Sequence, residues 1–126
     1  GRAFIEKAQA GSYDIIFLDA FGASEVPPHL ATVEFLAGVR RALRSDGVVV
    51  GNVWGPRYNR MYGPMMRSYE AVFERLVVLD VGGAVNRLAM GLPRTETVTQ
   101  PAMEERAARI GRTRPTTWLT SSTAVR

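Results

Sequence analysis

The chain has 126 residues, of which 46% are hydrophobic, and this is enough for one domain with a buried core. It has no cysteine, which excludes disulfides, thiolate metal sites and cysteine nucleophiles. It has a single histidine, which disfavours a histidine-based zinc site, so we expect no metal. The net charge of +4 comes mainly from the last 26 residues, which carry 5 basic and 2 acidic groups. The first 100 residues carry 11 basic and 10 acidic groups and are nearly neutral, so we expect no nucleic-acid partner.

The start of the chain, GRAFIEKAQAG, lacks the apolar core of a signal peptide, and no apolar run is long enough to span a bilayer. We therefore expect a cytoplasmic protein without a membrane partner. The chain opens on Gly1 and enters directly into what reads as the middle of a fold, so we interpret it as a fragment.

The first predicted elements are a short helix over residues 2–10 and a strand over Tyr13–Leu18. The strand is a nearly continuous apolar run, which is typical of a central strand covered on both faces. Asp19 follows where this run stops. Because ligands of open α/β sheets lie beyond the carboxyl ends of the strands, Asp19 is a candidate site residue. The alternative is that Asp19 only caps a turn.

A loop then leads to a second helix and a second strand. Thr32 is a suitable cap for a helix that runs to about Leu43, and residues 45–47 are expected to end it. The β-branched run Val48–Val53 predicts the next strand. Strand, helix and strand within about forty residues indicate a right-handed βαβ unit with parallel strands.

The remaining pattern predicts a third helix from Met65, followed by strands over Leu76–Val81 and Asn86–Leu92 whose short connection favours an antiparallel hairpin. Beyond Pro93 the chain turns polar. We expect an appended helix within residues 94–112 and a disordered tail over residues 113–126.

The order of these elements resembles the carboxyl-terminal half of the spermidine synthase-like (polyamine aminopropyltransferase) family. The matching segments are GRAFIEK, YDIIFLDAF, PPHLATVEFLAGVRRAL followed by SDGVVVGNV, and NRLAMGLP, and the resemblance covers residues 1–93. It implies an α/β, Rossmann-like class I methyltransferase-type sheet with helices on both faces and a terminal antiparallel hairpin. It also implies that the amino-terminal half of the domain, with its glycine-rich nucleoside loop, is absent, and the chain indeed has no GxGxG motif.

The resemblance implies transfer of an aminopropyl group from decarboxylated S-adenosylmethionine to an amine. It also implies that the full-length parent protein is a homodimer. Asp19 takes the position of the family's catalytic, amine-contacting acid. A carboxylate suits this chemistry because it can accept the proton of the attacking nitrogen and attract a cationic substrate. The resemblance further implies cofactor contacts from Gly1, Asp19 and Ala20, and an amine pocket lined by Asn52.

One departure from the family pattern concerns the amine. Family members typically read DSSDP after this strand, whereas the chain reads DAFGA, so Gly22 stands in place of a second amine-binding acid. Glu25 could restore that negative charge, or it could simply face solvent, and Asn52 could be only a strand-end turn residue. Two alternatives therefore stay open: a methyltransferase that uses intact S-adenosylmethionine, and a non-catalytic scaffold domain of the same fold. For the isolated chain we expect no activity.

Overall fold

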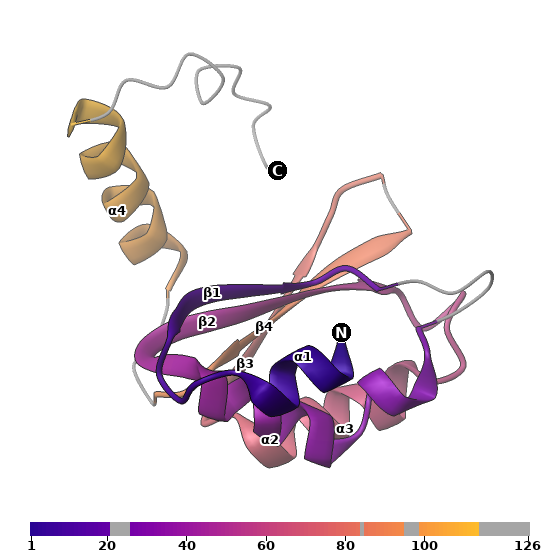
Figure 1. Cartoon of the computed structure of the whole chain (residues 1–126). Helices are drawn as coiled ribbons and strands as arrows, with labels where there is room; N and C mark the ends of the chain where they lie inside the picture. The colour runs from indigo at the N-terminus through magenta and orange to yellow at the C-terminus, as the bar shows by residue number, and fades with distance from the viewer. Residues whose placement is uncertain (21–25, 84, 95–98, 114–126) are drawn as a thin grey trace. The chain divides into compact units, whose positions relative to one another are not determined.

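A computed structural model describes residues 1–20, 26–83, 85–94 and 99–113 of the chain (Figure 1). The chain divides into two compact units, Gly1–Thr95 and Glu96–Arg126. In the second unit the described element is the helix α4 (Gln100–Thr113), in the region where the sequence predicts an appended helix. Within the described ranges, no helix combines the length and the apolar character needed to cross a membrane.

The first unit is a four-stranded mixed sheet with helices packed on it. Its elements in chain order are α1 (Arg2–Lys7), β1 (Tyr13–Leu18), the 3-10 helix η1 (Pro28–Leu30), α2 (Val33–Ala42), β2 (Leu43–Trp54), α3 (Tyr62–Val72), β3 (Arg75–Asp80) and β4 (Asn86–Leu92). The strand order is β1-β2-β4-β3, in which β1 and β2 are parallel while β4 is antiparallel to both of its neighbours. The predicted βαβ unit and terminal antiparallel hairpin are both present.

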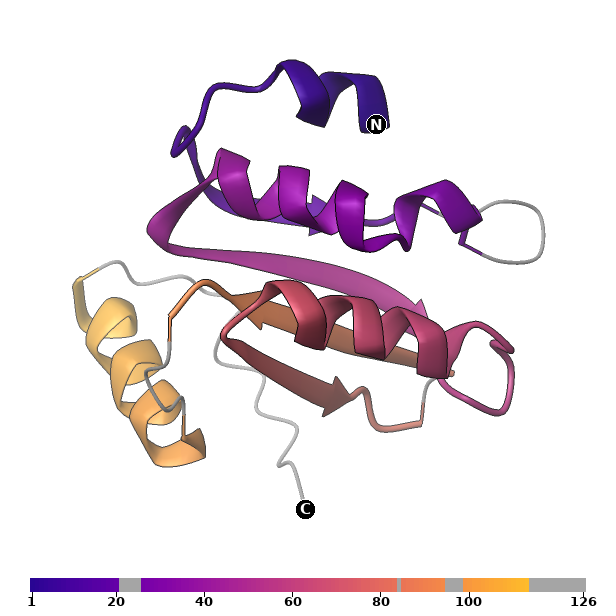
Figure 2. The same cartoon turned by 90° about the horizontal axis from the view of Figure 1, so that it is seen from below.

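The helices α1, α2 and α3 all lie on one face of this sheet (Figures 1 and 2). The strand β1 consequently alternates, because Ile16 and Leu18 pack against the core while Ile15 and Phe17 are 52% and 72% exposed on the other face. The α/β class is confirmed. We expected helices on both faces of the sheet and a first strand covered on both faces, whereas in the described part of this unit the helices cover one face. Within the described sheet β1 is an edge strand.

Two glycines let α3 approach the sheet closely. The rings of Tyr69 and Phe73 stack on each other with centroids 5.9 Å apart and lie over Gly51 of β2 and Gly91 of β4. A β-carbon at Gly91 would come within 2.7 Å of the Phe73 ring, and one at Gly51 would collide with the Tyr69 hydroxyl. The absence of these two side chains therefore sets the distance between α3 and the strands that lead to the site.

The junction between α2 and β2 differs from the prediction. Thr32 caps α2 as expected, since its Oγ1 accepts a hydrogen bond from the backbone nitrogen of Phe35 at 3.2 Å. We expected residues 45–47 to separate the helix from a strand that begins at Val48, but β2 already begins at Leu43. The pairing with β1 starts at Leu43 and skips to Val48, so residues 44–47 form an irregularity inside the strand rather than a turn before it.

Candidate functional site at the ends of the parallel strands

The site is built where the parallel strands β1 and β2 end. Asp19 directly follows β1, and the register pairs Leu18 with Gly51, which places Asp19 beside Asn52. The Asn52 side-chain nitrogen Nδ2 donates a hydrogen bond to Asp19 Oδ1 at 3.0 Å. Two predicted site residues, 33 positions apart in the sequence, are thus in direct contact.

A third polar side chain, Asn86, extends this contact onto β4. Its Nδ2 donates to Asn52 Oδ1 at 2.8 Å. In the antiparallel register Asn52 lies opposite Leu88 and Asn86 lies opposite Trp54, so the two asparagines are diagonal neighbours on the same face of the sheet. We did not predict Asn86. A polar residue at the start of an apolar strand cannot be assigned to the site until the register of that strand with its neighbour is known.

A cavity of about 350 Å³ borders β1 at the edge of the described sheet. Its lining includes Gly1, Asp19 and Ala20, together with apolar side chains of α1, β1 and α2. The structure therefore brings the three residues predicted to contact a cofactor to the wall of a single cavity.

A second, wider depression of about 580 Å³ lies on the face of the sheet opposite to the helices. Asp19, Asn52 and Asn86 form its polar part, and the rest of its lining is Phe17, Leu18, Val50, Val81 and Leu88. Asp19 is exposed and lines both hollows. A carboxylate in this position can accept a proton from, or attract, a cationic group that reaches it from either side.

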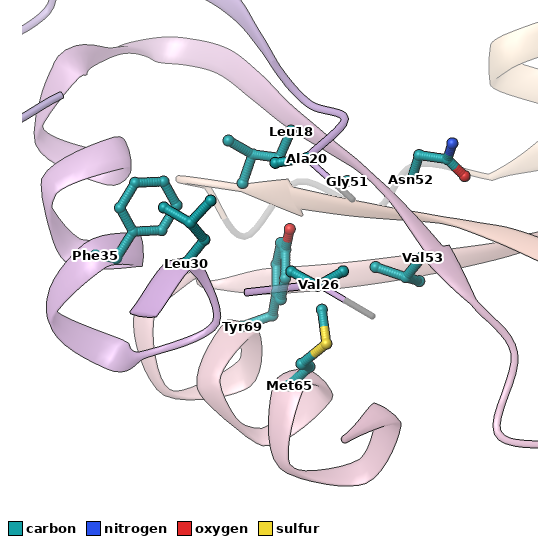
Figure 3. Close-up of a pocket in the computed structure, with 10 residues that line it drawn as sticks. All are labelled: Leu18, Ala20, Val26, Leu30, Phe35, Gly51, Asn52, Val53, Met65 and Tyr69. Atoms are coloured by element: carbon teal, nitrogen blue, oxygen red, sulfur yellow. The ribbon is translucent and has the colours of Figure 1, made fainter. Parts of the chain in front are cut away.

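A small buried pocket lies beneath the strand ends (Figure 3). It measures about 30 Å³, which is room for about one water molecule, and its lining includes Ala20, Gly51 and Tyr69. The Tyr69 hydroxyl points from α3 toward Gly51 (Figure 3), and burial raises the pKa of Tyr69 well above its ordinary value. Tyr69 supports the strand ends from the helix side.

Comparison with known proteins gives matches of two kinds. No protein-family model matches the chain. A polyamine aminopropyltransferase from Vibrio vulnificus is 36% identical over 74 residues, which are 57% of this chain and 24% of that protein. One from Clostridium acetobutylicum is 26% identical over 78 residues, or 62% of this chain and 27% of the relative. The chain thus spans about a quarter of the length of the curated relatives it matches.

Solved structures give the second kind of match. A probable spermidine synthase from Corynebacterium glutamicum superposes with a TM-score of 0.67 and 26% identity over 88% of this chain and 41% of its own. This chain has a spermidine synthase-like class I fold. Human Methyltransferase-like protein 13, solved in complex with SAH, has the same TM-score at 25% identity, covering 80% of this chain and 48% of its own. Spermidine synthase from Thermotoga maritima has the same fold. It superposes with a TM-score of 0.58 and 19% identity over 75% of this chain and 33% of its own.

Of the predicted site residues, Glu25 lies outside the described residues, and so does Gly22, which stands where the family pattern has a second acid. Among the residues that the structure does describe, no group of three or more His, Cys, Asp or Glu side chains is arranged to bind a metal ion. The described site is therefore one carboxylate supported by two amides.

Proposed function

We propose that this chain supplies part of the active site of a polyamine aminopropyltransferase-like enzyme, in which Asp19 binds the acceptor amine and serves as its general base. The observation that carries the proposal is the placement of Asp19. It is hydrogen-bonded to Asn52, and it borders both the cavity beside Gly1 and Ala20 and the depression on the open face of the sheet. The similarity to two polyamine aminopropyltransferases supports it.

The proposed reaction assigns Asp19 two tasks. The amine nitrogen forms a bond to the carbon next to the sulfonium of decarboxylated S-adenosylmethionine, the carbon–sulfur bond breaks, and its electron pair leaves on a neutral thioether. Asp19 takes the proton that the nitrogen must lose, a role typically worth about 10²- to 10⁴-fold in rate. Its charge also attracts a cationic amine, by on the order of 4 kcal/mol at 4 Å in a partly shielded site.

Several further parts of the proposal rest on the family resemblance. Gly1, Asp19 and Ala20 would contact the nucleoside donor from the cavity that they share. Glu25 would supply a second negative charge for the amine. The complete protein would act as a homodimer, and a cytoplasmic location stays a prediction.

The second candidate is a methyltransferase that uses S-adenosylmethionine on another acceptor. It is favoured by the equal structural similarity to Methyltransferase-like protein 13, whose structure holds SAH, and by Gly22 in place of a second acid. A non-catalytic domain of the same fold is the third possibility.

One assay on the complete protein distinguishes the two candidate enzymatic functions. Decarboxylated S-adenosylmethionine is offered with putrescine, cadaverine or spermidine, and aminopropylated product is measured by mass spectrometry. We expect product with at least one of these amines. Consumption of intact S-adenosylmethionine without any aminopropylated product would contradict the proposal and support the methyltransferase.

The substitution Asp19→Asn tests the role of the acid within that assay. It keeps the shape of the side chain but removes the base, so kcat/KM should fall by roughly 10²- to 10⁴-fold while the fold is retained, because Asp19 is exposed. The matched control is Asp14→Asn, since Asp14 is an exposed acid at the opposite end of β1 from Asp19, where it pairs with Arg44 at 3.4 Å. Unchanged activity of Asp19→Asn would exclude Asp19 as the base.

A further inference from the structure

The amide of Asn52 lies between two other polar side chains and contacts both. Its nitrogen donates to Asp19 on one side, and its oxygen accepts from Asn86 on the other. The row Asn86–Asn52–Asp19 crosses three strands, β4, β2 and the end of β1.

The chemistry of the row allows one orientation of the amides. An ionised carboxylate can only accept hydrogen bonds, so Asn52 must turn its NH₂ group toward Asp19. Its carbonyl oxygen then faces Asn86, which must donate in turn. If Asn52 rotated by half a turn, its oxygen would meet the carboxylate and its NH₂ group would meet the NH₂ group of Asn86.

We propose that Asn86 is a positioning residue for Asp19, acting through Asn52; this inference rests on the proposed function. Asn86 fixes the orientation of the Asn52 amide, and that amide fixes Asp19 Oδ1. Among the described residues no other hydrogen bond reaches the Asp19 carboxylate, which leaves its second oxygen open to the proposed amine. Asn52 thereby supports the carboxylate.

The hairpin end that carries Asn86 is anchored on both sides. The backbone oxygen of Val85 accepts a hydrogen bond from the Gly55 nitrogen at 2.9 Å. On the other side, Arg87 forms an ion pair with Asp80 at 2.5 Å and donates to the Tyr62 hydroxyl at 3.2 Å. Because its neighbours are fixed, Asn86 can hold Asn52 in one place without a hydrogen bond of its own to Asp19.

The kinetic test compares Asn86→Ala and Asn86→Asp in the complete protein, each with and without Asn52→Ala. Asn86→Ala should lower kcat for aminopropyl transfer by roughly 2- to 12-fold, the equivalent of one net hydrogen bond. Asn86→Asp should lower kcat further, although it keeps the side-chain shape, because it turns an acceptor toward Asn52 Oδ1. In the Asn52→Ala background, the additional substitution Asn86→Ala should lower kcat no further.

The control is Val85→Ala, which alters the same hairpin end but not the row of amides, and it should leave kcat unchanged. The inference is overturned if Asn86→Asp is at least as active as Asn86→Ala. It is also overturned if Asn86→Ala costs the same factor with and without Asn52→Ala.

A second measurement does not depend on the reaction. In the ¹⁵N-labelled chain, the side-chain NH₂ signals of Asn52 are assigned by their loss in Asn52→Ala. Asn86→Ala and Asp19→Ala should each shift these signals, and Val85→Ala should not. Unmoved signals in Asn86→Ala overturn the inference whatever the enzyme does. Shifted signals without aminopropyl transfer support the row of hydrogen bonds and contradict only the proposed function.

Discussion

Single residues at this site take their roles from neighbours on other strands. Asp19 is an exposed acid at a strand end, and it becomes a candidate base because Asn52 holds one of its oxygens and Asp19 lines two hollows. Tyr69 shows the opposite case, since it carries a hydroxyl near the strand ends but is 3% exposed. Burial raises the pKa of Tyr69. Its side chain lines neither of the two hollows beside Asp19, so its part is structural.

The buried Tyr69 hydroxyl predicts how stability depends on pH. In the unfolded chain a tyrosine loses its proton near pH 10, whereas the folded protein keeps Tyr69 protonated to higher pH. The folded state therefore binds more protons above about pH 10, and the free energy of unfolding should fall there, by at most about 1.4 kcal/mol per pH unit from this group.

The measurement is urea unfolding between about pH 8 and pH 11. Tyr69→Phe should flatten the decline above about pH 10, whereas Tyr58→Phe, at a side chain that is 57% exposed, should not. Parallel curves for the wild type and Tyr69→Phe would show that Tyr69 ionises as easily in the folded protein as in the unfolded one.

At the scale of the element, α1 depends on α2. A helix of six residues is too short to persist alone. Arg41 of α2 holds its end, because the guanidinium donates to the backbone oxygens of Ala8 at 2.8 Å and Ile5 at 2.9 Å. Since Gly1 at the start of α1 lines the cavity beside Asp19, this contact also supports the proposed site.

Removal of the Arg41 side chain should loosen α1 in particular. In Arg41→Ala, the backbone amides of Ile5 and Ala8 should exchange with solvent at least roughly 10-fold faster, the equivalent of one hydrogen bond from a charged group. Hydrogen exchange followed by NMR measures this, with amides of α3 as the internal reference. Arg40→Ala is the matched control, because Arg40 contacts Pro93 and Glu74 instead. Equal acceleration in α1 and α3 would mean that Arg41 stabilises the whole unit.

At the scale of the first unit, exposed apolar side chains lie on the open face of the sheet along β1. Ile15 and Phe17 project from that face beside an edge strand without a partner in the described sheet. Edge strands of this kind tend to associate with other strands.

Self-association of the chain should consequently depend on β1. Sedimentation velocity at increasing concentration should show oligomers for the wild type, and Phe17→Lys should shift the distribution toward monomer. Tyr58→Lys replaces another exposed aromatic residue, outside the sheet, and should behave as the wild type. A wild type that stays monomeric throughout, or an equal effect of both substitutions, would contradict association through β1.

Short-range patterns were enough to predict the order and type of the elements and the candidate acid. The Thr32 cap, the third helix and the hairpin depend on residues only a few positions apart, and all three are present in the structure. Asp19 could be singled out because the end of an apolar run also marks the end of a strand.

The tertiary structure alone decided which residues surround that acid and which faces are covered. Asn86 meets Asn52 only through the register of β2 with β4, and β2 begins at Leu43 only because that residue pairs with Tyr13. Likewise, Phe17 belongs to an apolar run typical of a buried strand, yet it is exposed because the described helices of the first unit lie on the other face. Register and coverage depend on residues far apart in the chain, and a local pattern carries no information about their alignment.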